Sequence, residues 1–228
     1  AVEVAAARFA ADDTVRILIL SGAGGKAFVS GADVSKFETE RASSEAVANY
    51  NATTKRVYDM IEEFPKPTIA QIDGFCIGGG VALSLSCDLR VCGEGSQFAV
   101  PAAKLGLGYG YEGLNRLVKI VGPAFAKEIF FTARRFDADE ARVMGLVNRV
   151  VPDAKVGDVV QETAEMIAAN APMTVESAKY IVAQTVMNES ERNLDECAAR
   201  VKACFESADY IEGRRAFLEK RKANFVGA

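Results

Sequence analysis

Histidine is absent from all 228 residues of the chain. Histidine is the commonest general base in enzymes and a frequent metal ligand, and it activates serine or cysteine in many nucleophilic sites. Its absence excludes a Ser–His or Cys–His pair, a histidine base and a histidine-ligated metal within these residues. Any chemistry must therefore come from other side chains or from the backbone.

Cysteine is sparse and shows no regular spacing. The five residues form no CxxC pair, and they are Cys76, Cys87, Cys92, Cys197 and Cys204. Small secreted domains that depend on disulfides usually carry an even number of cysteines at regular intervals. We therefore expect no disulfide framework and a reducing, cytoplasmic location, either a bacterial cytosol or a reducing organelle matrix.

Long hydrophobic runs are missing too. No stretch approaches the roughly 18 apolar residues that a membrane-spanning helix requires. The alanine-rich beginning contains acidic residues and lacks the organisation of a signal peptide. We expect a soluble protein with no membrane span.

The chain has no excess of positive charge. Lys and Arg number 27 against 31 Asp and Glu, so the net charge is −4. A nucleic-acid-binding domain normally carries a clustered basic surface, and we therefore expect a small-molecule ligand and no nucleic-acid partner. The basic run at residues 220–222 has two interpretations, contact with a phosphate-bearing ligand or a solvated helix face.

The hydrophobic pattern predicts a mixed α/β chain with one main domain and a small appended region. A strand buried on both faces is expected at residues 15–20, further strands at 68–72 and 89–92, and a short extended segment at 146–151. Predicted helices cover residues 43–63, 114–121, 123–132 and 137–144, and nearly everything from residue 156 onward. Residues 28–34 and 101–113 are expected to be loops, and the second loop is a candidate pocket wall.

The loop at residues 21–26 ends in Gly-Gly-Lys and invites comparison with a phosphate-binding loop. The Walker spacing fails, because Leu20 occupies the position of the first glycine and Ala27 replaces the required serine or threonine. The dinucleotide fingerprint also fails, because the glycine spacing is wrong. These motifs therefore give no support to nucleotide binding.

Three consecutive glycines, Gly78, Gly79 and Gly80, lie between a β-rich segment and a helix of small residues. Glycines allow backbone N–H groups to approach a ligand without interference from a Cβ atom, and a helix that begins there adds unpaired donors. The arrangement suits an anion. From these residues alone, the anion could be a phosphate or a transient oxyanion such as a thioester enolate.

Four motifs occur in the order found in the crotonase (enoyl-CoA hydratase/isomerase) family, which this chain closely resembles over nearly its whole length. They are Phe-Val-Ser-Gly-Ala-Asp at 28–33, Pro-Lys-Pro-Thr-Ile-Ala-Gln-Ile-Asp-Gly at 65–74, the glycine triplet with Cys87-Asp88, and Phe-Leu-Glu-Lys-Arg-Lys-Ala-Asn-Phe at 217–225. Family members usually carry about one more strand pair before the point where this sequence begins. The resemblance therefore implies a shortened front.

The resemblance implies an α/β fold, a crotonase-like spiral of ββα units at residues 1–155 with a C-terminal helical trimerisation region at 156–228. It implies an acyl-CoA thioester as ligand, a homotrimer or hexamer, and no separate cofactor because CoA is part of the substrate. The backbone N–H groups of Ala32 and Gly79 would form the oxyanion hole. The residues expected to hold CoA are Ser30, Gly31, Val34, Phe217 and Lys220, the last two contributed by a neighbouring subunit.

Two positions depart from the hydratase pattern. Where enoyl-CoA hydratases carry the two glutamates that position and deprotonate water, this chain has Ala82 and Ala102. Alanine cannot transfer a proton, so the usual two-carboxylate hydration is not expected. The resemblance leaves open an enoyl-CoA hydratase or isomerase activity by another route, a methylmalonyl-CoA decarboxylase-like activity, and a catalytically weak CoA-binding subunit.

Two side chains are candidates for proton transfer. Tyr109 resembles a tyrosine of the methylmalonyl-CoA decarboxylase branch, although that branch has a histidine where this chain has Ala32. Glu112 lies two positions after the acidic residue of the isomerase and dehalogenase branches, where this chain has Gly110. The alternatives are a pocket-lining aromatic for Tyr109 and a charge in the first turn of a helix for Glu112.

Overall fold

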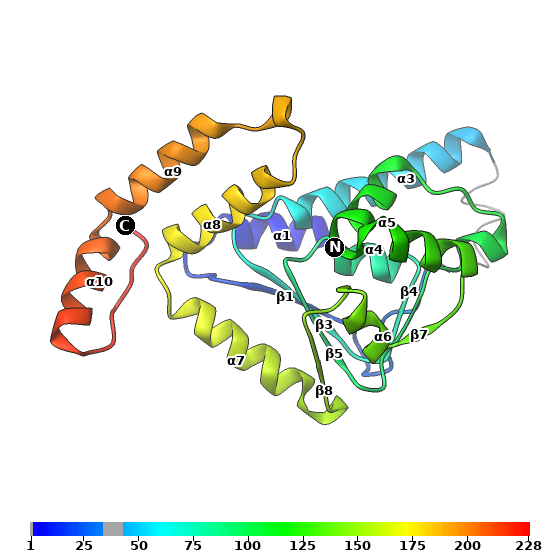
Figure 1. Cartoon of the computed structure of the whole chain (residues 1–228), viewed down its shortest axis with the longest axis horizontal. Helices are drawn as coiled ribbons and strands as arrows, with labels where there is room; N and C mark the ends of the chain where they lie inside the picture. The colour runs from blue at the N-terminus through cyan, green and yellow to red at the C-terminus, as the bar shows by residue number, and fades with distance from the viewer. Residues whose placement is uncertain (1, 34–42) are drawn as a thin grey trace. The chain divides into compact units, whose positions relative to one another are not determined.

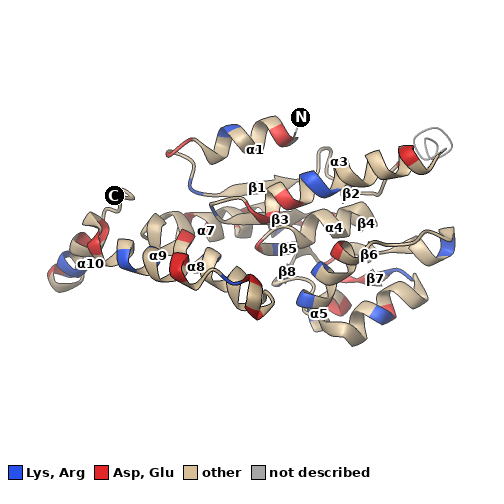
Figure 2. Ribbon diagram, turned by 90° about the horizontal axis from the view of Figure 1, so that it is seen from above, with Lys and Arg blue, Asp and Glu red and all other residues tan. Residues whose placement is uncertain are grey.

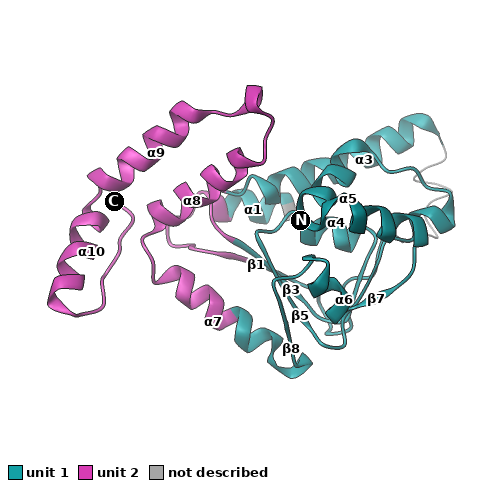
Figure 3. Cartoon of the chain, in the orientation of Figure 1, with its two compact units in different colours: residues 1–8, 19–64, 68–160 teal, residues 9–18, 65–67, 161–228 magenta. Residues whose placement is uncertain are grey.

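The computed structural model describes residues 2–33 and 43–228. The chain divides into two compact units, coloured separately in Figure 3. Unit 1 comprises residues 1–8, 19–64 and 68–160, and unit 2 comprises residues 9–18, 65–67 and 161–228. The domain boundary predicted between residues 155 and 156 stays a prediction.

The strands form two four-stranded sheets (Figure 1). The first has the order β1 (Leu18–Ser21), β3 (Thr68–Ile72), β5 (Leu89–Gly93), β8 (Arg149–Val151). The second has the order β2 (Ala27–Val29), β4 (Phe75–Ile77), β6 (Gln97–Ala99), β7 (Phe136–Asp137). The pairs β3–β5, β5–β8, β2–β4 and β4–β6 are parallel, and β6–β7 is antiparallel.

From β1 to β6, successive strands alternate between the two sheets. β1 and β2 lead into α3 (Ser44–Glu62), β3 and β4 into α4 (Gly79–Leu85), and β5 and β6 into the 3₁₀ helix η2 (Pro101–Leu105) and α5 (Tyr111–Thr132). Each turn of the chain therefore adds one strand to each sheet and then a helix. The predicted α/β spiral of ββα units is confirmed.

The central strands β3 and β5 are largely buried on both faces. The nearly continuous apolar run at 15–20 predicted the same for β1, but this prediction is wrong, because β1 lies at the edge of its sheet and Ile19 is 36% exposed. Ile69, Ile72 and Cys92 have no exposed surface. In the second sheet, Phe98 stacks on Phe136 with ring centroids 5.7 Å apart. Apolar side chains inside both sheets thus form the core of unit 1 and hold the strand ends in fixed positions.

The buried guanidinium of Arg90 binds backbone carbonyl groups at the C-terminal end of α4. Arg90, on β5, is 5% exposed. Its guanidinium donates to the carbonyl oxygens of Leu146 at 2.7 Å, Ser84 at 3.2 Å and Cys87 at 2.6 Å. Because Ser84 and Cys87 lie at the end of α4, Arg90 satisfies carbonyl groups that the helix leaves unpaired. This contact fixes the helix whose other end carries the glycine triplet.

The structure corrects several element predictions. Phe28 and Val29 belong to β2, although residues 28–34 were expected to be a loop, and β6 was not predicted. β4 coincides with the β-rich segment expected before the glycine triplet. All three strands have only three residues, too few to show an alternating pattern. Helix α5 begins at Tyr111, earlier than predicted, and it bends at Gly122, whose φ of 73° separates the two predicted helical segments.

The remaining elements largely follow the predicted helical pattern. They are α1 (Val2–Ala10), α6 (Ala138–Val143), η3 (Asp153–Lys155), α7 (Val156–Ala168), α8 (Pro172–Thr185), η4 (Glu189–Glu191), α9 (Leu194–Glu206) and α10 (Ala208–Glu219). In unit 2, α8 packs against α9, and α9 contacts α10. The ribbon in Figure 2 is coloured both blue, for Lys and Arg, and red, for Asp and Glu, along α10.

The last residues of the chain fold back onto the start of α10. Asp209, which is 2% exposed, accepts hydrogen bonds from the backbone N–H groups of Val226 at 2.8 Å and Gly227 at 2.9 Å. The C-terminal segment is thereby attached to unit 2. Among the residues that the structure describes, no helix combines the length and apolar character that crossing a membrane would demand.

Candidate active site

A pocket of about 550 Å³ in unit 1 contains most of the residues singled out from the sequence. Its walls come from the segments that follow β2, β4 and β6, together with one face of α3 and the start of α5. The lining residues predicted from the sequence are Ser30, Gly31, Ala32, Gly79, Tyr109 and Glu112. Ala82 and Ala102 also line this pocket.

Strand pairing brings these segments together. β2 and β4 are parallel, with Val29 opposite Cys76, and β4 and β6 are parallel, with Ile77 opposite Ala99. The carboxyl ends of all three strands therefore lie at the same edge of the sheet. Loops that leave this edge converge even though they are far apart in the sequence, which is the usual position of a ligand site beside a parallel sheet.

The glycine triplet has a backbone conformation that depends on glycine. Gly78 has a φ of 55°, and its N–H donates to the carbonyl of Ala99 at 2.8 Å. The carbonyl of Gly78 accepts from the N–H of Ala82 at 3.2 Å. Because C=O and N–H point in opposite directions across a trans peptide, the N–H of Gly79 points away from the helix body and has no partner within α4.

The third glycine allows α4 to approach β2. A Cβ atom on Gly80 would lie 2.4 Å from the carbonyl oxygen of Val29. No side chain fits at this distance, so glycine at residue 80 is a packing requirement. α4 itself has seven residues. The backbone N–H group of Gly79, rather than the dipole of a long helix, is therefore what this segment offers a ligand.

The loop after β2 approaches the same place. Gly31 has a φ of 108°, and a Cβ atom added to it would lie 3.7 Å from the carbonyl oxygen of Ile77, one residue before the triplet. Ala32 and Gly79 both line the pocket. Two backbone segments that could donate N–H groups to one ligand atom thus meet here, as an oxyanion hole requires.

Tyr109 and Glu112 lie in the wall opposite the strand ends, at the start of α5. The Tyr109 ring packs edge-on against Phe130, with centroids 4.9 Å apart and an interplanar angle of 74°. Glu112 lies in the first turn of α5 and is exposed. Both side chains therefore belong to the pocket, and Glu112 is also placed where a helix favours negative charge.

Sequence reasoning missed the contribution of α3. Tyr50, Thr54 and Tyr58 line the pocket at intervals of four residues, so they share one face of the helix. The hydroxyl of Tyr58 donates to the carbonyl of Gly79 at 3.3 Å. This spacing is the signal that could have identified these residues, but a polar stripe on a helix is normally interpreted as a solvated surface.

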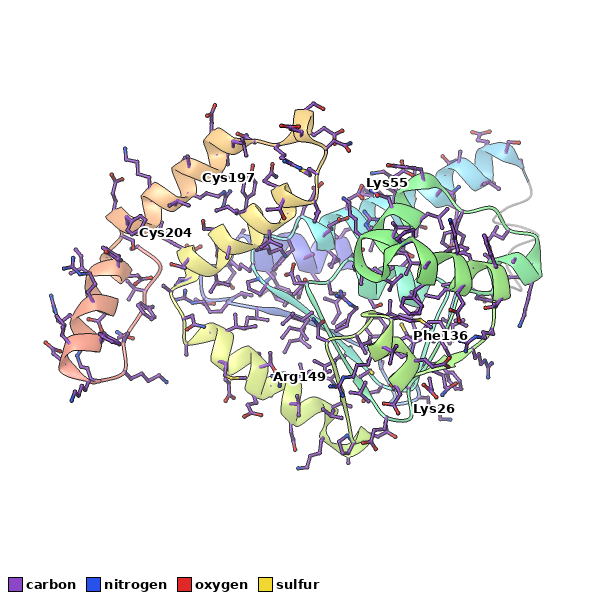
Figure 4. All side chains as sticks on the ribbon, viewed as in Figure 1. Lys26, Lys55, Phe136, Arg149, Cys197 and Cys204 are labelled. Carbon is purple, nitrogen blue, oxygen red and sulfur yellow. The ribbon has the colours of Figure 1, made fainter. Side chains whose placement is uncertain are left out.

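An ion-pair network fixes α3 to α5 beside the pocket. Arg116 donates to Asp59 and to Glu62, each at 2.5 Å, and Lys55, labelled on α3 in Figure 4, donates to Asp59 at 2.5 Å. Burial alone would raise the pKa of Asp59, but hydrogen bonds from Lys55 and Arg116 lower it below its ordinary value. The guanidinium of Arg116 also lies 5.9 Å from the centroid of the Tyr58 ring.

The surroundings of Tyr58 keep its hydroxyl protonated. Burial raises the pKa of Tyr58, and the neighbouring Tyr109 and Tyr50 raise it further. At neutral pH the phenol is therefore a hydrogen-bond donor rather than a base.

The residues predicted to hold CoA fall in different places. Ser30 and Gly31 line the pocket. Val34 lies outside the described residues. Phe217 and Lys220 belong to unit 2, where Phe217 is 84% exposed and Lys220 ends α10 with a φ of 54°.

Comparisons with known proteins agree with this architecture. The enoyl-CoA hydratase/isomerase family matches residues 3–228. A crotonyl-CoA hydratase of Syntrophomonas wolfei is 37% identical over 215 residues, which are 94% of this chain and 82% of that protein. A carnitinyl-CoA dehydratase of Citrobacter koseri is 34% identical over 224 residues, which are 96% of this chain and 84% of that protein.

Among solved structures, an enoyl-CoA hydratase/carnithine racemase from Magnetospirillum magneticum has a TM-score of 0.92 to this chain at 37% identity, covering 100% of this chain and 84% of that one. Fold, site and relatives together define a protein of the crotonase superfamily. Within it, the chain belongs to the enoyl-CoA hydratase/isomerase family.

Proposed function

We propose that the pocket binds an acyl-CoA thioester and stabilises its enolate through the backbone N–H groups of Ala32 and Gly79. The observation that carries this proposal is the meeting of the Ala32 loop and the glycine triplet in one pocket. Relatives named as a crotonyl-CoA hydratase and a carnitinyl-CoA dehydratase support a CoA thioester as the class of ligand.

Enolate formation needs stabilisation of charge on the thioester oxygen. Loss of a proton from the α-carbon, or loss of CO₂ from that carbon, leaves an electron pair that delocalises onto this oxygen. Preorganised N–H donors aimed at the oxygen each contribute about 3 kcal/mol. Both donors belong to the main chain, so this part of the mechanism is independent of any acidic or basic side chain.

The proton transfer that completes the reaction would use Glu112 or Tyr109. Among the described residues that line the pocket, Glu112 supplies the carboxylate, because Ala82 and Ala102 occupy the other positions where the family's hydratases carry one. A carboxylate suits an isomerase, which takes a proton from one carbon and returns it to another. A tyrosine hydroxyl suits a decarboxylase, which needs only a proton donor for the enolate.

The reaction can be assigned by assaying purified protein with crotonyl-CoA, a 3-enoyl-CoA and methylmalonyl-CoA. We expect slow hydration of crotonyl-CoA and faster turnover of one of the other two. Glu112→Gln should reduce isomerisation by about 10²–10⁴-fold, and Tyr109→Phe should reduce decarboxylation within the same range. Rapid crotonyl-CoA hydration that both variants retain in full would contradict this assignment.

A second candidate function is a CoA-binding subunit with weak catalysis, favoured by the two alanines. It predicts that calorimetry detects acyl-CoA binding while none of the three substrates turns over. Complete lack of CoA affinity would contradict both candidates. In either case CoA would arrive as part of the ligand, and we propose no additional cofactor.

A further inference from the structure

We infer that Tyr58 is a positioning residue of the oxyanion hole, which holds the Gly79 backbone in the orientation that presents its N–H to the ligand. The inference rests on the proposed function of the pocket. It concerns a side chain on α3, 21 residues away from Gly79 in the sequence, that touches the proposed donor residue directly.

The hydrogen bond from the Tyr58 hydroxyl adds a restraint on the backbone of Gly79. The peptide before Gly79 is held by the hydrogen bond that the N–H of Ala82 donates to the Gly78 carbonyl at 3.2 Å. The peptide after Gly79 carries the carbonyl that accepts the Tyr58 hydroxyl at 3.3 Å. Rotation about either backbone bond of Gly79 would break one of these contacts, and a glycine has no side chain to limit that rotation. Gly79 is also the first residue of α4, so Tyr58 adds a side-chain restraint on the second peptide plane to the restraint that the helix provides.

Tyr58 and Gly79 are in close contact. A Cβ atom on Gly79 would lie 3.3 Å from the Tyr58 hydroxyl oxygen. This contact is tighter than usual, so a side chain at residue 79 would require the hydroxyl to move by a few tenths of an ångström. The phenol of Tyr58 and the absence of a side chain at Gly79 therefore fit each other sterically.

Tyr58 is itself held in place. Arg116 lies over its ring, and the same guanidinium binds Asp59 and Glu62 on the helix that carries Tyr58. These contacts orient the ring between α3 and α5 before any ligand arrives. Such preorganisation is what allows hydrogen-bond donors to stabilise a developing charge without reorganisation at the moment of reaction.

The test uses acetoacetyl-CoA, a 3-ketoacyl thioester whose enolate absorbs in the near ultraviolet. Absorbance per bound ligand reports the stabilisation of the enolate without requiring turnover. We expect Tyr58→Phe, which removes only the hydroxyl, to lower the ratio of bound enolate to bound keto form by about three- to tenfold, the effect of one neutral hydrogen bond. The dissociation constant of butyryl-CoA should change less than twofold.

Tyr180→Phe is the matched control, because it removes a hydroxyl from a tyrosine of unit 2 and keeps the ring that packs on Arg200. This variant should retain the enolate ratio of the unchanged protein. A merely structural role of Tyr58 would lower the unfolding temperature and leave the ratio per bound ligand unaltered, and that result would overturn the inference.

A double-mutant cycle with Gly79→Ala tests whether Tyr58 acts through Gly79. The added methyl group would lie 3.3 Å from the hydroxyl and displace it slightly, so Gly79→Ala should reduce the enolate ratio less in the Tyr58→Phe background than alone. Additive effects would refute the inference while leaving the proposed function intact. Failure of the unchanged protein to bind acetoacetyl-CoA, or to enolise it, would instead refute the proposed function and the inference with it.

Discussion

At the scale of single residues, the glycine triplet shows three different demands on one residue type. Gly78 needs a positive φ, Gly79 needs room for the Tyr58 hydroxyl, and Gly80 needs close contact with Val29 of β2. Only Gly79 is proposed to act on the ligand. Substitutions of Gly78 or Gly80 should therefore mainly lower the stability of the fold and change the reaction only indirectly.

Gly80→Ala should destabilise unit 1, because its Cβ atom would lie 2.4 Å from a backbone oxygen that cannot rotate away. We expect a loss of about 1–3 kcal/mol in the free energy of unfolding, the usual range for overpacked sites. Gly108→Ala is the control, since an added Cβ there meets nothing within 4 Å. Urea denaturation measures both, and equal stability of the two variants would contradict the role assigned to Gly80.

Sequence reasoning recovered the backbone part of the pocket better than its side chains. The Ala32 loop and the glycine triplet have recognisable motifs, so their presence in a common pocket could be expected. The spacing of Tyr58 on α3 could suggest a shared helix face, but its contact with Gly79 could not be predicted, because no local pattern encodes how closely α3 approaches α4. The identity of the proton-transfer residue likewise depends on the ligand, which leaves Tyr109 and Glu112 as candidates.

At the scale of secondary-structure elements, long apolar segments were predicted well and short ones were not. β3 and β5 each have five residues, and their burial follows from their apolar sequences. β2, β4 and β6 have three residues each. Their extended conformation is imposed by parallel pairing with one another, and these partners are separated by long stretches of chain.

The end of α10 carries a pH-dependent ion pair. Arg221 binds both carboxylate oxygens of Glu212, at 2.6 and 2.9 Å, and the N–H of Asn224 adds a third bond. These contacts lower the pKa of Glu212 from 4.5 to about 2. A carboxyl group whose pKa is lower in the folded than in the unfolded protein stabilises the folded state at pH values above its pKa in the unfolded protein. This stabilisation is lost as the pH falls toward the pKa of the group in the folded protein.

Glu212→Gln should therefore lower the unfolding temperature at pH 7, and the difference from the unchanged protein should disappear between pH 4.5 and about 2. Because the pair is partly exposed, high salt should reduce the difference as well. Glu206→Gln, whose partner Lys202 is 3.7 Å away, is the control and should have little effect. Circular dichroism across this pH range makes the measurement. A pH-independent difference would contradict the assignment.

At the scale of the whole molecule, unit 2 exposes large apolar side chains at the end of α10. Phe217 is 84% exposed and Leu218 is 80% exposed at the end of α10. They line a groove of about 910 Å³ together with residues of α8 and α9. Large exposed apolar patches commonly mark contacts between proteins, and we propose that this groove is such a contact in the homotrimer or hexamer that the family resemblance implies.

Sedimentation analysis should give a mass three or six times that of one chain. Leu218→Lys should shift the protein toward the monomer, because a lysine ammonium in an apolar contact loses its hydration without gaining a partner. Val4→Lys, in unit 1, replaces a side chain that is 75% exposed and serves as the control. A monomeric mass for the unchanged protein would refute the proposed assembly.

The use of backbone N–H groups in the proposed oxyanion hole affects how the activity of this protein can change by mutation. The N–H groups proposed to stabilise the enolate belong to the main chain, and every residue type except proline carries the same N–H group. Point substitutions can therefore alter the reaction at Ala82 or Ala102 while the oxyanion hole persists. The proposed stabilisation of the enolate depends on backbone geometry, whereas proton transfer depends on single side chains, so a new activity can arise without refolding the site.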